Sequence, residues 1–327
     1  MKARIKVIFL FIFTTLFFTN LVFSEKKLNI VTTTLEAADF VKQIGGDKVE
    51  VYSLYNGQYD FHFYEPRPTE VVRLKRADAV VVYGLALDSW FQPLLESSRN
   101  DKITFGSRGY IDMADGVKVL NVPSGKIDGR MGDVHPYGAC GYLYNQENIK
   151  IAIENIYLGL VRIAPEYKEY FEKNKNSYLS RIDSVFENLK RKMLPYRGTK
   201  IVQFHESWDY FAETFGLEIV TALEPKPGIP PSPTHLSKVK DIIKKEIPKF
   251  ILVETYYPQK PVKFISEQTG LKEVRVAHYV GGIKGRDTFI DNLEYTIDKI
   301  LEVLKPLVVI SPPTITSPIV INVSQAT

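Results

Sequence analysis

One long segment without a helix breaker constrains the fold of this chain more than any other feature. Residues 165–193 contain no glycine, and their only proline is the first of them, Pro165. Apolar and aromatic side chains recur there at helical spacing and charged side chains fill the other face, which predicts an amphipathic helix. Such a helix would be about 43 Å long, the width of a whole domain. We interpret it as a rigid connection between two lobes.

Short apolar runs alternate with helical patterns on both sides of this helix. The runs typical of strands are 28–34, 49–54, 79–83 and 102–105 before it, and 200–204, 218–222, 250–253 and 274–277 after it. Such alternation predicts parallel sheets with helices on both faces. The fold class is therefore α/β, with two parallel-sheet lobes joined by a long rigid helix.

The N-terminus has the pattern of a cleavable signal peptide at 1–24. Three basic residues precede an apolar run at 7–18, and the small residue Ser24 offers a cleavage point. No cysteine directly follows the apolar run, which argues against a lipid anchor there. The single cysteine, Cys140, cannot form an internal disulfide. We therefore expect a protein exported to the periplasm.

The whole chain then divides into five parts. They are a signal peptide at 1–24, an N-terminal α/β lobe at 25–144, linking helices at 145–196, a C-terminal α/β lobe at 197–305 and a tail at 306–327. The tail is rich in proline and β-branched residues, which is typical of an appended strand or a disordered end. Residues 106–144 are rich in glycine, and a loop this long is usually functional or disordered.

The charge balance bears on the choice of partner. Lys and Arg number 42 and Asp and Glu 38, which leaves a net charge of +4, and three of the positive charges lie within the predicted signal peptide. A nearly neutral mature chain argues against nucleic acid as the partner. We expect a monomer.

The histidines are the candidate metal ligands, and there are five: His62, His135, His205, His235 and His278. A single histidine is more often a surface or hydrogen-bonded residue than a ligand. His62, His205 and His278, however, each follow a predicted strand, at the sheet edge where open α/β folds bind ligands. Neutral imidazole suits Zn²⁺ and neighbouring transition metals. The shared position therefore favours a metal site between the lobes.

Several motifs occur in one consistent order along the chain. They are Asp60-Phe-His62-Phe-Tyr-Glu65-Pro66-Arg-Pro68, Phe204-His205-Glu-Ser-Trp208-Asp-Tyr210-Phe211-Ala212, Phe215-Gly216-Leu217, Pro231-Ser232-Pro233-Thr-His235-Leu236, Val253-Glu254 and Val280-Gly281-Gly282. This order resembles the solute-binding proteins of zinc and manganese ABC importers. The resemblance implies two lobes with a metal site in the cleft between them. It also implies a periplasmic protein that delivers Zn²⁺, or as second choice Mn²⁺, to a membrane permease and that is not an enzyme.

This chain departs from the family at two ligand positions. Many members carry G-N-P-H-Y-W at the second ligand, whereas Gly141 stands here in place of the histidine. His278 occupies about the place of the aspartate that is the fourth ligand in many members. His135, Cys140 or water could replace the second ligand, and we expect His135 because imidazole reaches further than a thiol.

The predicted metal site therefore consists of His62, His135, His205 and His278, and its nitrogen ligands favour Zn²⁺ over Mn²⁺. Asp133 and Glu65 are candidates for orienting the imidazoles. His235 falls in the first turn of a predicted helix and is not expected to be a ligand.

Two other classes of protein compete with the importer hypothesis. The altered second ligand and the tail leave open an exported adhesin or host-contact protein on the same fold, because fold does not fix function. A metallohydrolase is disfavoured, since His205-Glu206 is followed by Asp209 where H-E-x-x-H requires a second histidine.

Overall fold

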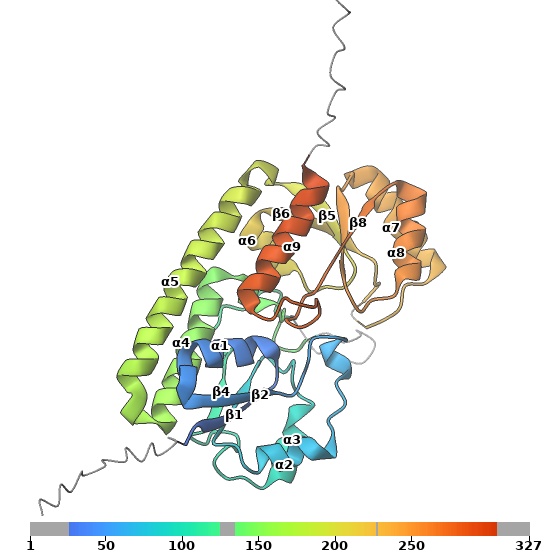
Figure 1. Cartoon of the computed structure of the whole chain (residues 1–327). Helices are drawn as coiled ribbons and strands as arrows, with labels where there is room; N and C mark the ends of the chain where they lie inside the picture. The colour runs from blue at the N-terminus through green and yellow to red at the C-terminus, as the bar shows by residue number, and fades with distance from the viewer. Residues whose placement is uncertain (1–25, 125–134, 227, 306–327) are drawn as a thin grey trace, which may run out of the picture.

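The computed structural model describes residues 26–124, 135–226 and 228–305 (Figure 1). The predicted signal peptide, the predicted tail and Asp133 lie outside these residues. None of the helices in the described part is both long enough and apolar enough to cross a bilayer.

Each lobe is built on one parallel four-stranded sheet. The N-terminal sheet has the order β2-β1-β3-β4, and the C-terminal sheet has the order β6-β5-β7-β8. The strands are β1 Leu28–Thr32, β2 Val49–Ser53, β3 Ala79–Val82, β4 Tyr110–Asp112, β5 Thr199–Gln203, β6 Leu217–Ala222, β7 Phe250–Glu254 and β8 Lys272–Val276. The two lobes thus repeat one strand order, in which the first strand of each lobe lies inside the sheet. The predicted α/β fold with two parallel sheets is confirmed.

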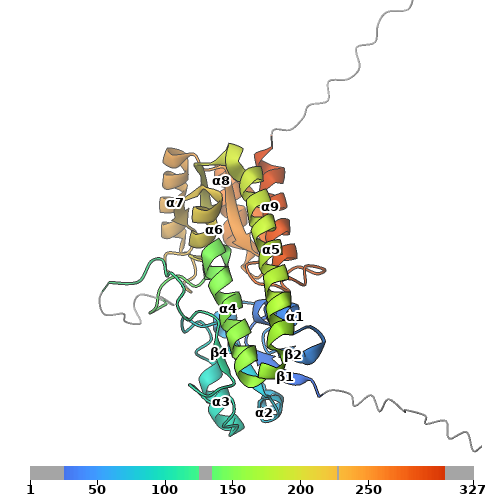
Figure 2. The same cartoon turned by 90° about the vertical axis from the view of Figure 1, so that its left-hand side faces the viewer.

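Helices cover both sheets and connect them. In the N-terminal lobe they are α1 Leu35–Gly45, α2 Pro68–Leu74 and α3 Phe91–Ser98, and in the C-terminal lobe α6 Asp209–Phe215, α7 Pro233–Glu246, α8 Gln259–Thr269 and α9 Phe289–Leu304. Between the lobes lie α4 Gln146–Ile163 and α5 Lys168–Met193. Figures 1 and 2 both show α4 beside α5.

Helix α5 is the predicted long connection, and it contacts both lobes. It packs against α1 on the N-terminal side and against α6 and α9 on the C-terminal side. Its Tyr178 ring lies 5.9 Å from the Phe40 ring of α1, and its Phe186 ring lies 6.2 Å from the Phe215 ring of α6. In Figure 1 the helix runs along one side of the molecule from the lower lobe to the upper one.

One predicted strand, at 102–105, is wrong. These residues form turns, and the fourth strand is instead β4, which pairs with β3 through Val81 and Ile111. The apolar Ile103 suggested a buried strand. Its side chain is indeed fully buried, but the backbone that carries it forms a turn. The Ile103 N–H donates to the Asn100 carbonyl at 3.1 Å, a hydrogen bond between residues three apart that is typical of a turn.

Hydrogen bonds also join the lobes directly. The Glu36 carboxylate on α1 accepts from the Val280 N–H at 2.6 Å, and the Asp39 carboxylate accepts from the Phe289 N–H at 2.9 Å. Both acceptors belong to the N-terminal lobe and both donors follow β8 in the C-terminal lobe. Helix α1 is therefore held against the segment that follows His278.

Candidate metal centre

His62 lies in a short 3₁₀ turn, Phe61–Phe63, that follows β2. Asp60 caps this turn, and its Oδ1 accepts from the His62 backbone N–H at 3.0 Å. The same oxygen lies 2.5 Å from the His62 ring Nδ1. A proton on Nδ1 is the one that satisfies this contact, which leaves the Nε2 lone pair free. Although burial opposes it, hydrogen bonding from His62 lowers the pKa of Asp60, which therefore stays ionised.

His205 comes from the opposite lobe, just after β5, and has a similar carboxylate partner. Its Nδ1 lies 2.7 Å from Oε2 of Glu224, and the His205 side chain is almost fully buried. Burial alone would lower its pKa, but Glu224 together with the nearby Glu254 and Asp60 raises it. The ring centroids of His205 and His62 are 5.7 Å apart. Imidazoles from the two lobes therefore meet.

His135 completes the cluster from the glycine-rich loop. Its Nε2 lies 2.9 Å from the His62 Nε2 and 3.5 Å from the Cys140 sulfur. Burial, with a smaller effect from His62 and His205, lowers the pKa of His135 to about 4, so the ring is neutral near pH 7. Burial also raises the pKa of the Cys140 thiol to about 12, so this thiol is protonated.

His278 is also buried, and one of its two ring nitrogens has a backbone partner. Its Nε2 lies 3.1 Å from the Ser207 carbonyl oxygen, to which it can only donate, and its Nδ1 has no partner among the described residues. The ring packs among aromatic rings, with centroids 5.1 Å from Tyr144 and 5.0 Å from Trp208. Burial lowers the pKa of His278 to about 3, so it is neutral.

Gly141 has no room for a side chain. A Cβ atom there would lie 2.7 Å from the Ser207 carbonyl oxygen and 3.2 Å from the His278 Nε2. The first distance is shorter than real Cβ contacts allow, and it involves backbone that cannot turn aside. His278 therefore fills the space beside the position at which many family members place their second histidine.

His235 lies apart from this group. Its backbone N–H donates to the capping hydroxyl of Ser232 at the start of α7, and its Nε2 lies 3.4 Å from the Ala222 carbonyl oxygen. His235 thus lies in the first turn of α7, as predicted from the sequence.

Sequence reasoning missed both carboxylates that orient the imidazoles, Asp60 and Glu224. Glu65, which was predicted for this role, is exposed. Asp60 carried a detectable signal, because an Asp two residues before a histidine at a turn can accept from that residue's N–H. Glu224 carried none, since it lies 19 residues from His205 in the sequence.

The cluster has the chemistry of a cation site. Two imidazoles whose Nδ1 atoms face carboxylates offer Nε2 lone pairs, which is the usual arrangement of metal-bound histidine. Two nitrogens on one tetrahedral Zn²⁺ lie about 3.3 Å apart, somewhat further than the 2.9 Å between His62 and His135. The contacts here are pairwise: across residues 26–124, 135–226 and 228–305, no three His, Cys, Asp or Glu side chains already converge as metal ligands. Binding an ion would therefore require these side chains to move.

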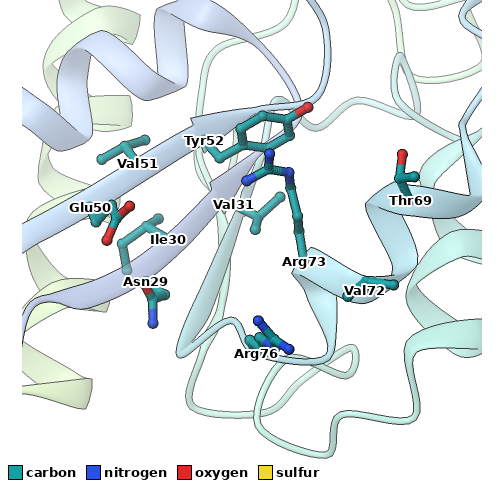
Figure 3. A pocket seen from close by; sticks show the side chains of 10 residues that line it. All are labelled: Asn29, Ile30, Val31, Glu50, Val51, Tyr52, Thr69, Val72, Arg73 and Arg76. Atoms are coloured by element: carbon teal, nitrogen blue, oxygen red, sulfur yellow. The ribbon is translucent and has the colours of Figure 1, made fainter.

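A hollow lined by neither histidine nor cysteine is a different feature and does not suit a cation. It has a volume of about 650 Å³ and lies between the β1–β2 face of the N-terminal sheet and α2 (Figure 3). The Arg73 guanidinium lies 3.8 Å from the centroid of the Tyr52 ring, and Arg76 adds a second positive charge. Neither histidine nor cysteine is among its lining residues.

Comparison with known proteins shows which family this chain matches and which solved structures share its fold. The model of the family described as Zinc-uptake complex component A periplasmic matches residues 30–303. The manganese ABC transporter substrate-binding lipoprotein PsaA of Streptococcus anginosus is 26% identical over 289 residues, which cover 85% of this chain and 90% of that protein. The iron ABC transporter substrate-binding lipoprotein MtsA of Streptococcus pyogenes serotype M1 is 26% identical over 285 residues, which cover 84% and 88%.

Solved structures share the two-lobed architecture. A crystal structure of ZnuA superposes with a TM-score of 0.72 at 23% identity, over 86% of this chain and 100% of that chain. The Mn-bound periplasmic metal binding protein from Candidatus Liberibacter asiaticus superposes with a TM-score of 0.70 at 21% identity, over 85% and 100%. At these identities the likeness is one of fold.

Proposed function

The chain belongs to the Zinc-uptake complex component A periplasmic family of metal-binding ABC transporter components, and from this premise we propose that it carries Zn²⁺ to a membrane permease. Membership makes it a transporter component and not an enzyme. The competing hypothesis of an adhesin receives no support from the relatives that match.

The proposal rests on one observation above all. The imidazoles of His62 and His205, from opposite lobes, lie 5.7 Å apart between centroids, and each faces its own carboxylate. With Nδ1 directed to a carboxylate, each imidazole of the pair can offer its Nε2 to a metal ion at the junction of the lobes. His135 supplies a third nitrogen 2.9 Å from that of His62. Because the ligands come from both lobes, a bound ion would tie the lobes together.

Zinc is the proposed cargo because the nitrogen-rich donors suit it. Oxygen donors suit Mn²⁺ better, and at a given site Zn²⁺ generally binds more tightly than Mn²⁺. The names of the relatives mention manganese and iron as well as zinc, so the choice of metal rests on the ligands of this chain. His278, the fourth ligand predicted from the sequence, can donate from Nε2 to the Ser207 carbonyl and still offer its Nδ1, which has no partner among the described residues.

The proposal also covers where the protein acts in the cell and how its chain is divided. A signal peptide at 1–24 would direct the chain to the periplasm, where it would act as a monomer and meet the permease. The division into an N-terminal lobe at 25–144, linking helices at 145–196 and a C-terminal lobe at 197–305 belongs to this proposal.

Native mass spectrometry and competition titration of the purified mature protein test the function. We expect one metal ion per chain, with Zn²⁺ preferred over Mn²⁺. His62→Ala and His205→Ala should each weaken Zn²⁺ binding by more than the roughly 100-fold that follows loss of an outer partner. His235→Ala is the matched control and should leave binding unchanged. Equal losses in all three variants, or a wild-type protein without metal affinity, would overturn the proposal.

A further inference from the structure

One face of the N-terminal sheet is left partly uncovered at the edge strand β2. On the covered face, Val49 packs against Gly45 of α1. Because side chains alternate along a strand, Glu50 and Tyr52 point to the opposite face, and both are exposed. Helices usually cover both faces of a parallel sheet. The side chains of this strip are therefore available to a ligand.

Helix α2 and the turn after it form a wall opposite this strip (Figure 3). Its residues that line the hollow recur at helical spacing on one side: Thr69, Val72, Arg73 and Arg76. The register of β1 with β2 places Asn29 beside Glu50 and Val31 beside Tyr52, which completes the floor. The enclosed volume of about 650 Å³ falls within the range of about 300–1,000 Å³ that small-molecule sites occupy.

Two guanidinium groups line this hollow without an ionic partner. The Arg73 guanidinium lies 3.8 Å from the centroid of the Tyr52 ring, and Arg76 follows on the same side of the helix. In the part of the chain that the structure describes, neither guanidinium forms an ion pair or a hydrogen bond. Glu50 is the one acid among the lining residues, so two positive charges are opposed by one negative charge.

The Tyr52 ring prepares Arg73 for an anion. A guanidinium held over an aromatic face keeps the N–H groups at its rim available as donors, and its planar fork matches a carboxylate through two parallel hydrogen bonds. Because the stacked side chain is already ordered, binding loses less rotamer entropy. Tyr52 and Val72, which are 36% and 51% exposed, provide apolar surface beside these donors.

We propose that this hollow binds a small carboxylate that carries a flat apolar body. The carboxylate contacts the two guanidiniums, and the apolar body lies against Tyr52 and Val72. A single negative charge suits two guanidiniums opposed by Glu50, and a bare inorganic anion would leave the apolar surface unused. No lining residue belongs to the imidazole cluster, so this site goes beyond metal transport and does not depend on it.

Benzoate is a suitable probe, because it joins one carboxylate to one ring. In an NMR titration of the mature wild type, benzoate should shift the methyl resonances of Val31 and Val72 to saturation. Acetate lacks the ring, benzyl alcohol lacks the charge and inorganic phosphate lacks an apolar body. Each of these three should bind at least about 10-fold more weakly than benzoate.

Three variants with the same kind of change separate this site from a general attraction to positive charge. Arg73→Gln removes the stacked guanidinium and should weaken benzoate binding by about 10-fold or more. Glu50→Gln removes the opposing carboxylate and should strengthen benzoate binding. Lys75→Gln is the matched control, since Lys75 is exposed and does not line the hollow, and it should leave binding unchanged. Melting temperatures check that each variant is folded.

Each other result overturns the proposal in a defined way. Equal losses in Arg73→Gln and Lys75→Gln, or weaker binding in Glu50→Gln, would contradict the charge assignment. Benzyl alcohol or phosphate that binds as tightly as benzoate would contradict the ligand class. Resonances of Val31 and Val72 that ignore benzoate, or that follow protein concentration because a second copy occupies the hollow, would contradict the site. The metal-carrier function would stand in all these cases, because Zn²⁺ titration tests it separately.

Discussion

At the residue scale, the orientation of two imidazoles depends on one carboxylate each. Asp60 receives two hydrogen bonds from His62, one from the backbone and one from the ring, so it fixes both the turn and the tautomer. Glu224 contacts only the ring of His205, through Nδ1, and does so from a separate loop. Carboxylate partners of this kind also raise the basicity of the imidazole, which strengthens its bond to a metal.

Removing either charge should therefore weaken metal binding without removing a ligand. We expect Asp60→Asn and Glu224→Gln each to lower Zn²⁺ affinity by roughly 10–100-fold, measured by competition with a chelator of known affinity. Glu65→Gln is the control, because Glu65 is exposed, and it should have no effect. Wild-type affinity in both variants would show that these carboxylates do not support the metal ligands.

Candidate metal ligands could be predicted from the sequence where they stand in a local sequence motif. The sequence predicts His62 and His205 because each stands in a motif that follows a strand, and the structure brings the two together. Glu224 could not be found, since its approach to His205 is a product of tertiary folding. The filling of the space beside Gly141 by His278 could not be predicted for the same reason, because the two positions are 137 apart in the sequence.

At the element scale, α5 fixes the distance between the lobes. One face of the helix is buried along its whole length, from Phe171 through Ile182 to Met193. This face was readable from the sequence because helical periodicity over a long segment is a strong signal. The three-residue strand β4 was missed, since so short a strand is defined by its pairing with β3 and not by its own pattern.

The burial of α5 leads to a prediction about stability. Phe186 is fully buried and packs against Phe215 of the C-terminal lobe, so Phe186→Ala should lower the free energy of unfolding by about 3–5 kcal/mol. Urea unfolding of the metal-free protein measures this change. Glu187→Ala, at the neighbouring and largely exposed position, should stay within about 0.5 kcal/mol of wild type. Similar losses in the two variants would contradict the packing described for this helix.

At the scale of the whole molecule, two lobes with the same strand order are joined by hydrogen bonds between α1 and residues that follow β8. The sequence predicted two α/β lobes, because strand and helix patterns alternate on both sides of α5. It did not predict the strand order, since an apolar pattern shows that a strand is buried but not which strand lies beside it. The contacts between the lobes, such as that of Glu36 with Val280, likewise depend on that arrangement.

Glu36 makes the junction of the lobes sensitive to pH. Burial raises the pKa of this carboxyl from 4.5 to about 7, and one of its oxygens has no partner among the described residues. Between these pH values the folded protein holds a proton that the unfolded chain has released. Because the unfolded state then binds fewer protons, the contribution of Glu36 to stability falls as pH rises from 4.5 to 7.

Glu36→Gln removes this dependence and keeps an oxygen acceptor for the Val280 N–H. The free energy of unfolding of the metal-free variant, relative to wild type, should therefore increase by at least about 1 kcal/mol between pH 4.5 and 8. Glu50→Gln, at an exposed position, is the control and should run parallel to wild type. A Glu36→Gln curve that also runs parallel would show that the buried carboxyl titrates normally.

The central claim is that this chain carries a transition metal between its lobes. The most direct test is the free energy of unfolding of the mature protein, measured in a metal-free buffer and again with excess Zn²⁺. At a free Zn²⁺ concentration 1,000 times the dissociation constant, binding should add roughly 4 kcal/mol to the stability of the wild type. It should add almost nothing to His62→Ala. A wild type whose unfolding is unchanged by excess Zn²⁺ and by excess Mn²⁺ would contradict the account.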